Sequence, residues 1–224
     1  VGYTVLMGTI DPHPAVKVAA AISPMVDGWI GDDWFQNGAF RQNSYDFVSE
    51  QNSVKGSGDV PLRSEADDYA EFLAAGSANA YARSRFGGQL PFAVKLAEHP
   101  NYDAWWQGQA VDRLLAARPI SVPLMIVTSQ WDQEDIYGGQ AVWKALKDKP
   151  DAAGRLFLVM GPWPHSQMIR NGSTLGALKF PNDTSLVFRR TYLKPFFDHN
   201  LKGAPDPKQP RVLTYATGPD VWRH

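Results

Sequence analysis

The chain contains no cysteine, no long apolar run and no excess of charge of either sign. The lack of cysteine excludes a disulfide framework, a cysteine-bound zinc or iron–sulfur cluster, and a thiol nucleophile. No stretch reaches eighteen consecutive apolar residues, so the sequence predicts no membrane-spanning helix. The 22 Lys and Arg residues are balanced by 23 Asp and Glu residues, which argues against a nucleic-acid-binding protein. What is present is a 44% hydrophobic, 12% aromatic composition, enough for a substantial core.

Short apolar runs of strand length alternate with helical segments in two parts of the chain. Strands are expected at 16–22, 122–128, 156–160 and 212–216, and helices at 2–9, 140–146 and about 183–201, the last ending at Gly203. This alternation is typical of a parallel, doubly wound sheet covered by helices on both faces. The sequence therefore predicts an α/β fold.

The segment between these parts has a different texture. Residues 37–118 contain no convincing strand, and amphipathic helices are expected over about 64–85 and 102–117. We interpret this block as a helical cap inserted between a first core part, 1–36, and a second, 119–208.

Two polar residues follow successive predicted strands, where the chemistry of such sheets is found. Asp132 follows the strand at 122–128, and His165 follows the strand at 156–160. Alone, a histidine in a loop rich in Trp and Pro is more often a packed structural group, and Asp132 could cap a helix. Together they have the chain order, acid before histidine, of an α/β-hydrolase triad. We therefore predict that Asp132 orients His165 and that His165 acts as general base.

A nucleophile is missing from this arrangement. The G-x-S-x-G turn that should carry the serine upstream of the acid does not occur in the sequence. Ser57 lacks the spacing and the preceding strand, and Ser129 lacks the flanking glycines. Gly2 followed by an apolar helix is what the end of such a turn would look like. We therefore expect the nucleophile to lie just before Val1 and this chain alone to be inactive.

Acidic residues gather in the same loops, at Asp32–Asp33 and at Glu134–Asp135. They could cap helices or solvate loops. They could also form a calcium shell, but the D-x-D-x-D-G spacing is missing, so we predict no metal. The functional interpretation is a patch of negative charge that binds an ammonium group of the substrate.

Three stretches together resemble the α-amino-acid ester hydrolases, within the wider cocaine-esterase-like and X-prolyl-dipeptidyl-peptidase-like serine hydrolases. They are 27–41 (DGWIGDDWFQNGAFR), 131–135 (WDQED) and 161–167 (GPWPHSQ), and the likeness continues through 99–106 and 196–198. The resemblance implies an α/β-hydrolase core, a helical cap and a C-terminal jelly roll that would start within 209–224. It places the nucleophilic serine two residues before Val1.

The resemblance also implies roles for particular residues. Asp132 and His165 would be catalytic, and Asp33, Glu134 and Asp135 would hold the substrate's α-ammonium group. Trp34 and Trp131 are candidates for the side-chain pocket, on adjacency alone.

The implied activity is hydrolysis or acyl transfer of α-amino acyl esters and amides, including β-lactam antibiotics, without a cofactor. The expected partner is such a small molecule, with no nucleic acid and no membrane. Export to the periplasm or secretion is expected from the resemblance, and a homo-oligomer is compatible with it. The alternatives are a general carboxylesterase, an X-Pro dipeptidyl-peptidase, or a non-catalytic fragment or binding subunit completed by another chain.

Overall fold

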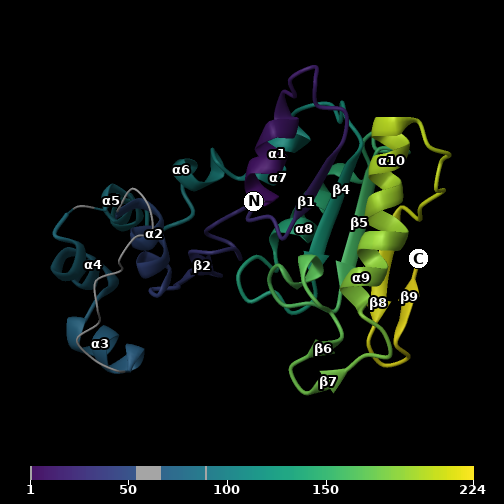
Figure 1. Ribbon diagram of the computed structural model, residues 1–224. Coiled ribbons are helices and arrows are strands. Elements are labelled where there is room, and N and C mark those ends of the chain that lie inside the picture. The colour runs from purple at the N-terminus through teal and green to yellow at the C-terminus, as the bar shows by residue number, and fades with distance from the viewer. Residues whose placement is uncertain (1, 54–66, 89) are drawn as a thin grey trace.

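The computed structural model describes residues 2–53, 67–88 and 90–224. At its centre is a five-stranded sheet in the order β1–β4–β5–β8–β9 (Figure 1). The strands are β1 (Ala19–Ile22), β4 (Leu124–Ser129), β5 (Leu156–Gly161), β8 (Val212–Ala216) and β9 (Val221–Arg223). The first four run parallel, and β9 returns antiparallel to β8. The predicted α/β fold with a mostly parallel sheet is confirmed.

Helices cover both faces of this sheet. On β4, Leu124 and Ile126 pack in one core cluster, whereas Met125 and Val127 pack in another. The first cluster includes α1 (Gly2–Ile10), α7 (Val111–Ala116) and α8 (Gly138–Leu146), and the second includes α9 (Thr184–Phe188) and α10 (Lys194–Lys202). Every residue of β4 is buried, which explains why its sequence is apolar without alternation.

The helix predicted over about 183–201 is present with a π-helical segment, Arg189–Leu193, between α9 and α10. Asp183 begins it, because its carboxylate accepts a hydrogen bond from the Leu186 N–H at 2.9 Å. Gly203 ends it in the left-handed conformation, at φ +67°.

The cap forms a separate group of helices beside the sheet, on the left of Figure 1. It comprises the hairpin β2 (Phe35–Gln36) and β3 (Ala39–Phe40), followed by α2 (Ser44–Ser53), α3 (Asp68–Ala75), α4 (Ala78–Phe86), α5 (Pro91–Glu98) and α6 (Ala104–Gln107). Its core is rich in aromatic residues, among them Phe35, Tyr45, Tyr81 and Trp106. The block 37–118 was predicted to contain no strand, and this is wrong for β3, which pairs with β2 just before the block. Strands of two residues are too short to be recognised in the sequence.

Two long helices predicted in the cap are each broken in the structure. The first is divided into α3 and α4 by Gly76, which adopts φ +75°, and by Ser77, whose Oγ accepts from the Ala80 N–H. The second is divided into α6, which ends at Gly108, and α7, which begins at Val111. At Gly76 the break follows from glycine's freedom to adopt a positive φ, whereas Gly108 keeps right-handed helical dihedrals at φ -71°. The expected start of the first helix, near Ser64, lies outside the described residues, as does Ser57.

Both ends of the predicted second core part differ from the structure. Val111 and Leu115 of α7 pack in the core cluster, so α7 joins the core layer although 37–118 was assigned to the cap. The assignment of 209–224 to a separate β-sandwich is also wrong for β8, which pairs parallel with β5, with Val212 opposite Leu158. A strand of alternating burial does not reveal its partner, which only the register of the sheet decides.

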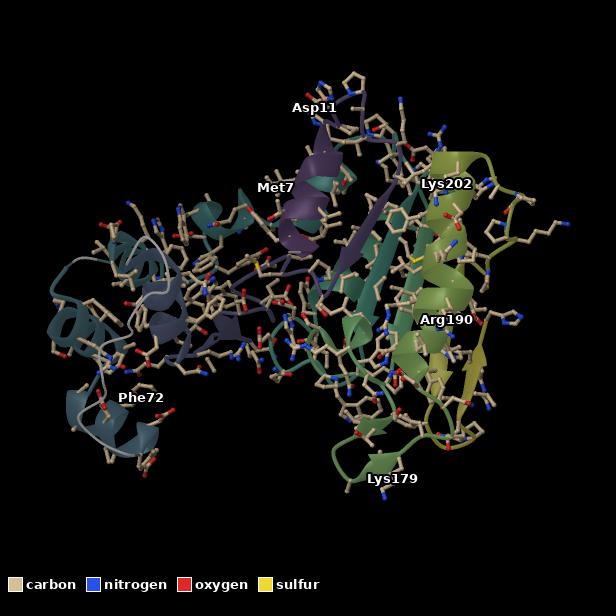
Figure 2. The ribbon with its side chains drawn as sticks, viewed as in Figure 1. Met7, Asp11, Phe72, Lys179, Arg190 and Lys202 are labelled. Carbon is tan, nitrogen blue, oxygen red and sulfur yellow. The ribbon has the colours of Figure 1, made fainter. Side chains whose placement is uncertain are left out.

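The carboxyl ends of the parallel strands define one edge of the molecule. Asp11 follows the end of α1 and Lys202 ends α10, and both lie at the edge where the strands begin (Figure 2). Lys179, in the short hairpin β6 (Thr174–Leu175) and β7 (Leu178–Lys179), lies at the opposite edge, whereas Phe72 lies out in the cap. Within the described part of the chain, no helix is both long and apolar enough to cross a bilayer.

Candidate active site

The candidate site is built by the loops that follow β1, β4 and β5, which all leave the sheet at the same edge. The loop after β1 carries Asp33, the loop after β4 carries Asp132, Glu134 and Asp135, and the loop after β5 carries His165. These side chains lie near one another because neighbouring parallel strands end at the same edge of the sheet, as the order of strands in the sequence predicted.

The loop that carries His165 is anchored by a buried tryptophan. Trp163 has no exposed surface, and its Nε1–H donates to Thr184 Oγ1 at the start of α9, at 2.9 Å. Gly161 makes room for the ring, since a Cβ there would lie 2.2 Å from a Trp163 carbon. The Gly-Pro-Trp-Pro segment thus fixes where His165 leaves the sheet.

His165 and Asp132 are in direct contact. Nδ1 of His165 lies 3.0 Å from Oδ1 and 3.1 Å from Oδ2 of Asp132, whose side chain is fully buried. Oδ1 also accepts the N–H groups of Glu134 and Asp135 at 2.9 Å each. Since a carboxylate only accepts, Nδ1 is the protonated nitrogen and Nε2 is left free to accept a proton.

The same contact moves both pKa values apart. The hydrogen bond to Asp132 raises the pKa of His165, against the opposing effect of burial. Burial tends to raise the pKa of Asp132, but the hydrogen bonds from His165 and from the two backbone N–H groups lower it overall. The pair is therefore arranged to stabilise a protonated imidazole beside an ionised carboxylate.

Three further carboxylates surround the imidazole. Glu134 Oε2 lies 3.6 Å from His165 Nε2, and Asp135 Oδ2 lies 3.7 Å from Nδ1. Asp33 is held next to them by its N–H, which donates to the Glu134 carbonyl at 3.2 Å, and it adopts the left-handed conformation at φ +48°. A non-glycine residue in this region is uncommon and marks a constrained turn.

The charges of these carboxylates oppose one another. Burial, followed by the charges of Asp33, Asp32, Asp132 and Glu134, raises the pKa of Asp135 to about 9. Burial and the charge of Glu134 likewise raise the pKa of Asp33, although Arg41 acts in the opposite direction. Arg41 was not among the predicted site residues, because no motif in the sequence places its charge beside Asp33. With its raised pKa, Asp135 stays protonated at neutral pH unless a cation binds beside it and favours its ionised form.

Asp32, the neighbour of Asp33, has a different environment. It is fully buried, and its carboxylate accepts the N–H groups of Val26 at 2.8 Å, Asp27 at 3.1 Å and Gly138 at 3.0 Å. Burial outweighs these hydrogen bonds and raises its pKa to about 7. Asp32 thus joins the loop after β1 to the start of α8. The sequence showed two adjacent aspartates and could not distinguish this one from Asp33.

Replacing Gly138 should disrupt this junction. A Cβ at Gly138 would lie 2.0 Å from the Pro24 carbonyl oxygen and 2.8 Å from Asp32 Oδ2, so Gly138→Ala forces backbone to move. We expect a loss of about 1–3 kcal/mol in the free energy of unfolding, measured by urea denaturation. Gly8→Ala in α1 is the matched control, because nothing lies within 4 Å of its Cβ, and alanine there should be neutral or stabilising. Equal losses in both variants would contradict the expectation.

The two tryptophans proposed for a side-chain pocket lie in different places. Trp34 is 9% exposed and lines a cavity of about 550 Å³ between the start of α1 and the cap. The cavity walls also include Tyr3, Met25, Asp27, Val48, Phe92 and Trp106. Trp131 is 43% exposed and is not part of this wall. The structure therefore brings Trp34 to a cavity and leaves Trp131 at the surface.

Gly2, which was predicted to end the nucleophile turn, is tightly packed at the start of α1. A Cβ at Gly2 would lie 2.4 Å from the Ile22 carbonyl oxygen and 2.6 Å from Pro24 Cα, so the start of α1 packs directly against the end of β1. Close packing of this kind requires glycine. Ser129, the other serine considered, is fully buried at the end of β4.

A doubly wound sheet with an acid after one strand and its contacting histidine after the next is the arrangement of α/β-hydrolase-type proteins. The sequence agrees: residues 1–167 match the family of X-Pro dipeptidyl-peptidases (S15 family), and the chain belongs to that family. No curated protein matches the chain.

Two solved structures are closely similar to the chain. One is an α-amino acid ester hydrolase labelled with selenomethionine, with a TM-score of 0.94 and 47% identity over 99% of this chain. The other is an aminopeptidase from a marine sediment archaeon, Thaumarchaeota archaeon, with a TM-score of 0.95 and 45% identity over 99% of this chain. The chain spans 36% of the length of the first and 37% of the second.

Proposed function

We propose that the complete protein containing this chain hydrolyses or transfers the acyl group of α-amino-acid esters and amides, aminoacyl β-lactams included. The observation that carries the proposal is the contacting Asp132–His165 pair with Asp33, Glu134 and Asp135 around it. The pair suits proton transfer to and from a nucleophile, and the carboxylates suit a substrate that brings a positive charge.

The proposed reaction uses a serine supplied from before Val1. Nε2 of His165 takes the serine hydroxyl proton as the oxygen attacks the substrate carbonyl. The imidazolium then gives the proton to the leaving alcohol or amine, which leaves an acyl-enzyme. In the second step, His165 removes a proton from water, or from an amine such as a β-lactam nucleus, as that molecule attacks the acyl carbon. The bond to the serine oxygen then breaks, and the imidazolium returns the proton to that oxygen. Asp132 holds the imidazole in the tautomer with Nδ1–H and stabilises its charged form.

The three surrounding carboxylates would bind the substrate's α-ammonium group. Asp135 is 4% exposed, and its Oδ1 has no hydrogen-bond partner among the described residues. An ammonium group brings three donors and one positive charge, which compensates both the missing donor and the repulsion among the acids. Trp34, Val48 and Phe92 would contact the acyl side chain in the cavity that they line.

A second function, removal of dipeptides or amino acids from peptide N-termini, is favoured by the family match and by the similarity to an aminopeptidase. A peptide N-terminus presents the same α-ammonium group to the same carboxylates. The two functions differ in the distance from the ammonium group to the scissile bond. Comparing an α-amino-acid ester with an Ala-Pro amide of the same leaving group separates them.

Asp33→Asn tests the ammonium site in the complete protein. Removing one charged partner should raise KM for an α-amino-acid ester by about 10-fold or more, since a hydrogen bond to a charged group contributes about 1.5–3 kcal/mol. kcat should change little, because the ammonium group is bound equally in ground and transition states. An ester of the same acyl size without the amine is the control, and its kinetics should not change. Equal losses for both esters would rule out the ammonium site.

A further inference from the structure

The edge that carries the proposed site also has the features of a divalent-cation site. Glu134, Asp135 and His165 each offer one ligand atom, and these atoms lie within 4.8 Å of one another. Acidic side chains often gather without an ion, so proximity alone decides nothing. The independent observation is the orphaned Oδ1 of Asp135, which is buried and has no hydrogen-bond partner in the described part of the chain. A buried oxygen in this state is unfavourable until a donor or a cation reaches it.

His165 is held as zinc-binding histidines are held. Such histidines commonly donate their second ring N–H to a carboxylate, which fixes the tautomer and raises the basicity of the ligating nitrogen. Asp132 does this for His165, because both of its oxygens lie within 3.1 Å of Nδ1. Nε2 is then the nitrogen available to an ion.

The spacing between His165 and Glu134 suits a tetrahedral ion, whereas Asp135 lies 3.7 Å from the other ring nitrogen, Nδ1, and would turn to reach an ion on Nε2. Two ligands on a tetrahedral zinc with bonds of about 2.1 Å lie about 3.4 Å apart. Nε2 of His165 already lies 3.6 Å from Oε2 of Glu134. One imidazole and two carboxylates are ligands that zinc accepts, whereas calcium takes six to eight oxygens.

We propose that Zn²⁺ binds between His165, Glu134 and Asp135, with Asp132 supporting the imidazole, and that the bound ion inhibits the protein reversibly. The ion occupies the Nε2 lone pair that would accept the serine proton. It also occupies two of the carboxylates that would hold the ammonium group. It acts as an inhibitor and is not a resident cofactor, which the sequence predicts to be absent. The inhibition rests on the proposed function, whereas the binding does not.

Calorimetric titration of the active protein containing this chain with zinc chloride tests the binding. We expect the wild-type protein to bind zinc at one site, and we expect Glu134→Gln to weaken zinc binding at that site at least 10-fold. The substitution preserves side-chain shape, and Glu134 is 39% exposed, so the fold should persist. His99→Gln is the matched control, because His99 also contacts a carboxylate, Asp103, at 2.6 Å. Its replacement should leave zinc binding unchanged.

Two further measurements keep the outcomes distinct. In wild-type protein, zinc should shift the imidazole resonances of His165 and leave those of His99 in place, which needs no variant. Zinc should also inhibit ester hydrolysis competitively with an α-amino-acid ester, and a chelator should restore activity. The inference is overturned if the protein hydrolyses esters but binds no zinc, or if His99→Gln abolishes zinc binding. Zinc binding that depends on Glu134 without any effect on hydrolysis leaves the cation site standing and contradicts the proposed catalytic role of His165.

Discussion

In the complete protein, Asp132→Asn should lower kcat for α-amino-acid esters by about ten-thousand-fold, the cost of the equivalent change in a serine-protease triad. An asparagine can accept from His165 only through one oxygen, and its amide can instead donate to Nδ1. The imidazole then adopts the tautomer with Nε2–H, which cannot take the serine proton. KM should change much less, because Asp132 lies behind the imidazole, with its side chain fully buried. Steady-state kinetics across pH measures both quantities.

The control for this prediction is the other histidine–carboxylate pair. Asp103→Asn removes the carboxylate that contacts His99 at 2.6 Å in the cap, and kcat should stay within a few-fold of the wild type. A kcat for Asp132→Asn within tenfold of wild type would show that Asp132 does not support His165 in catalysis.

Asp135→Asn should stabilise the folded protein as the pH rises, while it weakens binding of α-amino-acid esters. The Asp135 carboxyl ionises near 3.8 when unfolded and at about 9 when folded. Between these values unfolding releases a proton, so stability from this group is complete below about pH 4 and falls as pH rises toward 9. Asparagine removes that fall. At neutral pH the gain should be about 2–4 kcal/mol in the free energy of unfolding.

Urea denaturation at several pH values measures this gain. The difference between variant and wild type should vanish below pH 4 and grow toward pH 9. Asp183→Asn is the opposite control: despite some burial, hydrogen bonds from the Leu186 and Gly172 N–H groups lower the Asp183 pKa. Its carboxylate therefore stabilises the fold at neutral pH and loses that effect in acid, so the variant should be less stable at pH 7. An Asp135→Asn protein less stable than wild type at pH 8 would contradict the argument. A functional residue that costs stability is expected where like charges are gathered to bind a cation.

Much of the fold could be predicted because buried positions are occupied by apolar residues in patterns that depend on the secondary structure. The strands β4 and β5 are apolar on both faces since helices cover both sides of the sheet, and this made them recognisable. Asp183 and Gly203 mark the ends of the last long helix through a side-chain cap and a left-handed turn. The partner of β8 could not be predicted, because alternating burial fits a core edge and a sandwich equally well.

The contact between Asp132 and His165 could be predicted from the order of strands, since parallel neighbours bring their ends together. The environment of each carboxylate could not. Asp32 and Asp33 are adjacent in the chain, yet the carboxylate of Asp32 accepts three backbone N–H groups, whereas Asp33 lies near enough to His165 for their charges to interact. Their different roles follow from one constrained turn at φ +48°, which no composition reveals.

The sequence by itself determined that this chain is a layered α/β protein whose acid and histidine meet at the carboxyl edge of a parallel sheet. Apolar periodicity and strand order suffice for that, because they reflect local burial and short connections. Only the tertiary structure decided which acids lie near His165 and that Trp34 rather than Trp131 lines a cavity. It also decided that Asp135 is buried with one oxygen that no described residue contacts by a hydrogen bond. These depend on distances between segments from 33 to 106 residues apart in the chain. Such distances are set by packing, which residue spacing along the chain does not encode.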